Sequence, residues 1–137
     1  MSKKAILITF CSAFAILAAA TMVFGFSRQL WIDVFTVDGV TVNANTGAVT
    51  ITKPTLPATV LVAGSANKDR KGGNLSQLKV SLTDNGVEVY APSNANLDTA
   101  GNFSLPWTVT TSGVHTLVAT VSQGGQSFSD TTTVTVQ

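Results

Sequence analysis

Residues that commonly carry out chemistry are scarce in this sequence. Its 137 residues include one cysteine, Cys11, and one histidine, His115. A single cysteine cannot form an intramolecular disulfide, so the fold must be stabilised by packing. One histidine and one cysteine are also too few ligands for a zinc site, and Lys71-Gly72-Gly73 lacks the spacing of a phosphate-binding loop. We therefore expect no catalytic residue, no metal, no cofactor and no enzymatic activity.

An excess of charge of either sign is missing as well. Eight Lys and Arg residues stand against seven Asp and Glu residues. Two of the basic residues, Lys3 and Lys4, precede a long apolar run, which leaves 8 − 2 = 6 basic groups against seven acidic ones in the rest of the chain. Nucleic-acid binding needs a concentrated basic surface. The composition therefore argues against a nucleic-acid partner, and no feature indicates a small-molecule substrate.

What the chain does have is an uncharged apolar run from Ala5 to Phe26. A helix of about 20 residues spans the ~30 Å hydrocarbon core of a bilayer, so the sequence predicts a single transmembrane anchor over residues 1–27. Lys3 and Lys4 favour a cytoplasmic N-terminus. The C-terminal domain is then expected on the periplasmic or extracellular side.

Other interpretations of this run remain open. Ala18-Ala19-Ala20 could form the exit of a cleaved secretory signal, although the run continues apolar to Phe26. A lipoprotein signal is less compatible, because the bulky Phe10 precedes Cys11. The sequence Lys3-Lys4-Ala5 before an apolar helix also looks like an archaeal prepilin-type signal, which would make the helix the core of a filament.

Two groups of residues near the anchor are candidates for contacts in or at the membrane. Ser12, Ala15 and Ala19 are spaced three and four apart, so they would share one helix face and let another helix approach closely. Arg28 and Trp31 are expected at the membrane interface, where indole rings are enriched. We expect residues 28–46 to form an interfacial connector and a first strand. That strand is placed near Thr36, about nine residues after Phe26.

Beyond the connector, the hydrophobic pattern alternates with a period of two, which is typical of strands with one buried face. Asn-Gly and Gly-Gly pairs between these segments are typical of hairpin turns. The sequence therefore predicts a mainly β domain over residues 47–137, built as a two-sheet sandwich of seven or eight strands. The predicted core residues are Leu78, Val80, Leu82, Phe103, Leu105, Trp107, Leu117 and Val121.

The stretch from Val49 to Val136, about two thirds of the chain, resembles a bacterial Ig-like domain. The resemblance is carried by Ile51-Thr52-Lys53-Pro54, Val62-Ala63-Gly64-Ser65-Ala66, Gly101-Asn102-Phe103-Ser104-Leu105-Pro106-Trp107 and Gly113-Val114-His115-Thr116-Leu117-Val118-Ala119. It implies an Ig-like sandwich and says little about function. In such families a Gly-x-Tyr-Thr element often starts the penultimate strand, and His115 stands in the aromatic place. The phenol hydroxyl that could tie a corner of the fold is therefore missing.

These features predict a membrane-anchored structural module whose partners are the lipid bilayer and other membrane protein subunits. We expect an accessory or assembly subunit of a larger complex, for example a respiratory or photosynthetic one. The alternatives are a pilin-like filament subunit and a surface adhesin, for which Tyr90 and Phe128 are the aromatic candidates. Oxygen ligands for calcium occur at Asp84-Asn85-Gly86 and around Asp98, and we interpret both as turns.

Overall fold

The computed structural model describes residues 29–68 and 75–137, and these residues form a mainly β domain with two sheets. The mainly β prediction is thereby confirmed. The predicted transmembrane segment, with Ser12, Ala15 and Ala19, lies outside the described residues, as does Arg28. Among the residues that are described, no helix has the length and apolarity needed to cross a bilayer.

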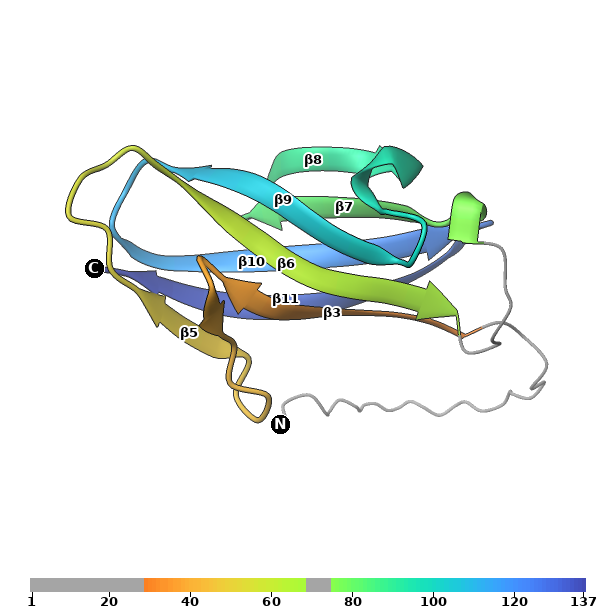
Figure 1. Ribbon diagram of the computed structural model, residues 1–137, viewed down its shortest axis with the longest axis horizontal. Helices are drawn as coiled ribbons and strands as arrows, with labels where there is room; N and C mark the ends of the chain where they lie inside the picture. Colours follow the sequence, from red (N-terminus) through yellow and green to blue (C-terminus); the bar gives the residue numbers. More distant parts are fainter. Residues whose placement is uncertain (1–28, 69–74) are drawn as a thin grey trace.

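The strands divide into one sheet of five and one of four (Figure 1). The five-stranded sheet has the order β5-β11-β10-β7-β8, and the four-stranded sheet has the order β4-β3-β6-β9. Neighbours are antiparallel except for β5 and β11, which are parallel. The strand bounds are β3 Leu30–Val37, β4 Val40–Thr41, β5 Ala48–Ile51, β6 Ala58–Lys68, β7 Lys79–Asp84, β8 Val87–Ser93, β9 Asn102–Val109, β10 Gly113–Gln123 and β11 Gln126–Val136. Two short 3-10 turns, η1 Leu75–Gln77 and η2 Asn94–Asn96, flank β7 and β8 in sequence.

The core lies between the two sheets and is built from alternate residues of each long strand. In β9, for example, Phe103, Leu105, Trp107 and Val109 are buried while the residues between them are exposed. All eight residues named above as core from their alternation are buried, with relative exposures of 5% or less. Local periodicity was therefore a sufficient guide to these positions, because successive side chains of a strand point to opposite faces.

Three two-residue turns with positive φ connect hairpins. Asn85 and Gly86 have φ of 50° and 83° between β7 and β8, and Gly124 and Gly125 have 55° and 84° between β10 and β11. The third turn was not recognised in the sequence. Asp38 (φ 55°) and Gly39 (φ 77°) separate β3 from β4, where a single first strand near Thr36 was expected. Asp-Gly is a strong signal for a hairpin turn, so this turn could have been predicted from the sequence.

The segment before this turn differs most from expectation. Residues 30–35 were expected to be an apolar connector along the membrane or against another protein. They form most of β3 instead, and Leu30, Ile32 and Val34 are buried in the core. Strand β3 pairs with β6 over Leu30–Val37, with a bulge between Val34 and Thr36. The first described strand of the two sheets thus starts at Leu30. The described residues contain nine strands, and seven of them, β5 to β11, lie within residues 47–137, where seven or eight were expected.

Gly64 of β6 lies very close to β3 and to Phe103, next to the bulge. A Cβ atom at this position would lie 2.0 Å from the carbonyl oxygen of Asp33 and 2.7 Å from the ring of Phe103. Only glycine lets the two backbones approach this closely.

Candidate functional site

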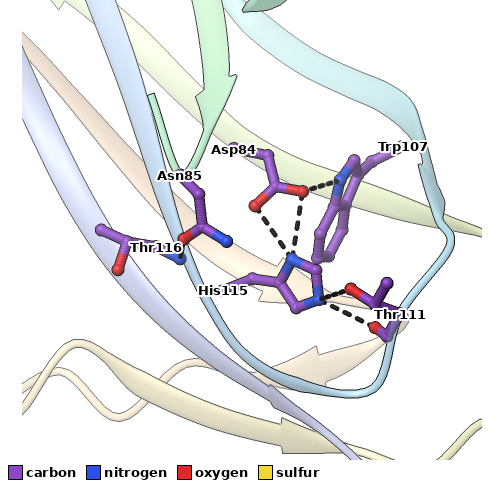
Figure 2. Close-up of polar contacts among 6 residues, drawn as sticks. All are labelled: Asp84, Asn85, Trp107, Thr111, His115 and Thr116. Atoms are coloured by element: carbon purple, nitrogen blue, oxygen red, sulfur yellow. Dashed lines mark hydrogen bonds and ion pairs between the residues drawn. The ribbon is translucent and has the colours of Figure 1, made fainter. Parts of the chain in front are cut away.

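The most concentrated chemistry in the described residues is a buried polar cluster at one end of the two sheets (Figure 2). It consists of Asp84 at the end of β7, Trp107 on β9, and His115 near the start of β10, together with Thr111 in the loop before β10. Asp84 has the same strand parity as Val80 and Leu82, and His115 has that of Leu117. Both side chains therefore point into the layer between the sheets.

Sheet register brings these residues together. Asp84 is paired with Leu117 on β10, so His115 lies two residues along the same face. Trp107 approaches from the other sheet. Its indole N–H donates to Asp84 Oδ2 at 3.2 Å, and its ring meets the imidazole edge to face at a centroid distance of 5.3 Å. The cluster therefore ties the five-stranded sheet to the four-stranded one.

The partners of His115 indicate which of its ring nitrogens donate hydrogen bonds. Its Nε2 lies 2.9 Å from the carbonyl oxygen of Thr111, and a carbonyl oxygen can only accept. Its Nδ1 lies 2.9 Å and 3.1 Å from the two carboxylate oxygens of Asp84. Both ring nitrogens therefore donate, which is the pattern of an imidazolium paired with a carboxylate.

The electrostatics of the site agree with this geometry. Burial lowers the pKa of His115, but the hydrogen bonds with Thr111 and Asp84 and the charge of Asp84 outweigh it, so the pKa is raised above the usual 6.5. The side chains are 6% exposed for His115 and 20% for Asp84. The pair is thus largely shielded from water.

The cluster contains a carboxylate, an imidazole and a hydroxyl in an order that superficially matches a nucleophile triad. The geometry at Thr111 differs from that of a triad. Nε2 is directed at the carbonyl oxygen, whereas the Thr111 hydroxyl is 3.5 Å away, which is too long for a good hydrogen bond. A doubly donating ring has no lone pair with which to accept a proton from a hydroxyl. The arrangement links β7, β9 and the start of β10 through hydrogen bonds.

No pattern in the sequence connected Asp84 with His115, and the fold brings the two side chains into contact. Asp84 was interpreted as part of a turn, and His115 as the residue in the aromatic position of the Ig-like pattern. A signal was available, because Asp84 continues the apolar face of β7, and a carboxylate on a buried face requires a partner. What local patterning could not give was which strand carries that partner.

The two loops considered for calcium use their carboxylates in other ways. Asp84 is occupied by His115 and Trp107. Asp98 Oδ1 accepts hydrogen bonds from the backbone N–H groups of Ala100 and Asn102 at 2.9 and 2.8 Å. Within the described part of the chain, no three His, Cys, Asp or Glu side chains converge as metal ligands would.

The three aromatic residues considered for membrane or ligand contacts differ in exposure and in their contacts. Trp31, expected at the membrane interface, lies on the outer face of β3 and is 39% exposed. The Tyr90 hydroxyl donates to the carbonyl oxygen of Pro106 at 2.6 Å, which links β8 to β9 across the edge of the two sheets. Phe128 on β11 is 48% exposed.

Comparison with known proteins adds no assignment: no family model, no curated protein and no solved structure matches this chain.

Proposed function

We propose that this protein is a non-enzymatic, membrane-anchored interaction module with an Ig-like domain on the exoplasmic face. In this role it is an accessory or assembly subunit of a larger membrane protein complex, for example a respiratory or photosynthetic one. The observation that carries the proposal is the short distance along the chain between the apolar run and the first strand.

Only three residues, 27–29, separate Phe26 from the start of β3 at Leu30. Three extended residues span at most about 10 Å. An anchor ending at Phe26 would therefore hold the domain directly on the bilayer surface, closer than the connector of about nine residues that the sequence suggested. A domain held this close cannot reach far from the cell, which favours contacts with neighbouring subunits in the same membrane.

The strand order supports the Ig-like part of the proposal. One sheet, β3-β6-β9, corresponds to the A, B and E strands of that architecture, and β11-β10-β7-β8 corresponds to G, F, C and C′. Ig-like domains often carry a tyrosine near the start of strand F whose hydroxyl bonds back to the upstream backbone. His115 makes the equivalent contact through Nε2 to Thr111, so an imidazole ties the corner that was expected to lack a tie.

The buried cluster supports a non-enzymatic role. Both nitrogens of His115 are used as donors inside the fold, and the His115 residue is only 4% exposed. A general base needs a free lone pair within reach of a substrate proton. We assign the cluster to stability rather than to turnover.

Gentle detergent extraction of native membranes tests the proposal. We expect the protein to resist an alkaline wash, and to migrate on a native gel with stoichiometric companions identified by mass spectrometry. Migration as a single species of 14.2 kDa would contradict the subunit role. An N-terminus at Thr21 in the soluble exported fraction would contradict the anchor, and filaments in sheared surface material would favour the pilin-like alternative.

A further inference from the structure

An open groove of about 1010 Å³ runs between β3 and β11, one strand from each sheet, and is bordered by the loop between β4 and β5. Its lining includes Ile32, Val34, Phe128, Asp130 and Thr131. The groove lies where the strands beside β3 and β11 stop short, so it exposes strand edges as well as side chains.

The free edges follow from the pairing. Strand β11 has eleven residues, but β5 pairs only with Thr133–Val136, which leaves 11 − 4 = 7 residues unaccompanied on that side. The N–H of Thr133 donates to Gly47 on the β5 side. Backbone groups two residues apart in a strand point the same way, so those of Thr131 and Ser129 are directed toward the groove and away from β10.

The facing edge of β3 is similarly incomplete. Strand β4 pairs only with Thr36 and Val37 of its eight residues. Further along β3, the N–H of Val34 donates across the gap to Asp130 Oδ2 at 2.8 Å. The Asp130 carboxylate thus accepts a backbone hydrogen bond that a neighbouring strand would accept elsewhere in the sheet.

Phe128 is exposed for the same reason. It is paired with Val121, and directly opposite residues share a face of the sheet. Val121 is fully buried, whereas Phe128 is 48% exposed. An aromatic side chain on the core face is therefore left half uncovered beside the groove.

We propose that this groove binds an extended β-strand from a partner membrane subunit. The occupant would add to the free edge of β11 over about seven residues, a length of about 23 Å. It would place alternate apolar side chains on Phe128. The lining also carries Asp33, an acidic residue on β3, so a Lys or Arg beside the apolar positions would complement it.

The chain outside the structure indicates where this strand comes from. This inference rests on the proposed function, because an anchor ending at Phe26 leaves only residues 27–29 before Leu30. The groove would then open close to the bilayer, within reach of a segment leaving the membrane in a neighbouring subunit.

Site-specific photo-crosslinking in native membranes tests the inference. A benzophenone amino acid replaces Phe128 in the full-length protein, and in a matched control it replaces Leu61. Leu61 is 49% exposed on β6 and does not line the groove. We expect an adduct at position 128 and none at position 61. Peptide sequencing of the adduct should identify a segment of another membrane protein with alternating apolar residues and a flanking Lys or Arg.

Thr131→Pro provides the second measurement, made with the benzophenone still at position 128. Proline removes a backbone N–H directed at the groove and leaves the β10 ladder intact, so we expect the adduct yield to fall at least tenfold. An unchanged yield would overturn strand addition. An adduct with residues 21–28 of the same chain, an adduct with a second copy, or no adduct in an intact complex would also overturn the inference. Retention after an alkaline wash reports separately on the anchor, so failure of the proposed function is distinguishable from failure at the groove.

Discussion

The buried cluster around His115 and the groove beside Phe128 both lie between the same two sheets, but the space is filled at the cluster and open at the groove. At the cluster, a charged pair is enclosed and each of its principal polar atoms has a partner. At the groove, an aromatic residue on the core face remains half exposed, and two strands have no neighbouring strand along much of one edge. We assign the cluster to stability and propose the groove for association, so the two regions are expected to serve different roles.

The largest expected loss of stability follows removal of the Asp84 carboxylate from the cluster. Asp84→Ala leaves the His115 imidazolium buried without its counter-charge and removes the acceptor of the Trp107 N–H. Breaking a buried pair in this way costs about 3–5 kcal/mol of unfolding free energy. Urea denaturation of the purified protein measures it, and Asp33→Ala on the exposed face of β3 is the control, expected to change stability by less than about 0.5 kcal/mol. Equal effects of the two substitutions would contradict the role given to the cluster.

A smaller loss is expected from Trp107→Phe, which keeps most of the buried ring but removes the donor to Asp84. Hydrogen bonds to charged groups contribute about 1.5–3 kcal/mol, and the 3.2 Å length places this one at the lower end. The double variant with Asp84→Ala should destabilise by less than the sum of the single variants, with a coupling of at least about 0.5 kcal/mol. Strict additivity would show that the two side chains do not interact.

The cluster should also make stability depend on pH. The folded-state pKa of His115 is raised above its unfolded value near 6.5. Its contribution is therefore fully present below about pH 6.5 and is lost as pH rises through the folded value. We expect a lower urea midpoint at pH 9 than at pH 6, and a smaller difference in His115→Phe. An NMR titration of the single imidazole gives the folded pKa directly, and a value below 6.5 would contradict the assignment.

The smallest effect is expected at the groove. Phe128→Ala should cost about 1 kcal/mol, because roughly half of the side chain is already in contact with water. Phe103→Ala is the matched comparison, since Phe103 also lies on the core face but is only 4% exposed, and it should cost about 3–5 kcal/mol. Similar losses at the two phenylalanines in thermal or urea unfolding would mean that Phe128 is not left uncovered in solution.

Local patterns predicted much of the fold. The alternation around Leu82, Leu105 and Leu117 located buried strand faces, and Asn85-Gly86 and Gly124-Gly125 located hairpins. These signals are local, since strand parity and positive φ depend on adjacent residues. The pattern was misinterpreted at residues 30–35, which follow the predicted membrane anchor and were expected to be an interfacial connector. Leu30, Ile32 and Val34 alternate like any other strand, and they fill the core.

The amino-acid sequence thus carried the β class, most of the turns and the identities of many buried residues, because each follows from short-range chemistry. Strand order and register decided the rest. They brought Asp84 and Trp107 to His115 and ended β4 and β5 before they could cover β3 and β11. Such contacts join residues more than 20 positions apart. No local period encodes them, so the charged cluster and the open groove both emerge only when the sheets are assembled.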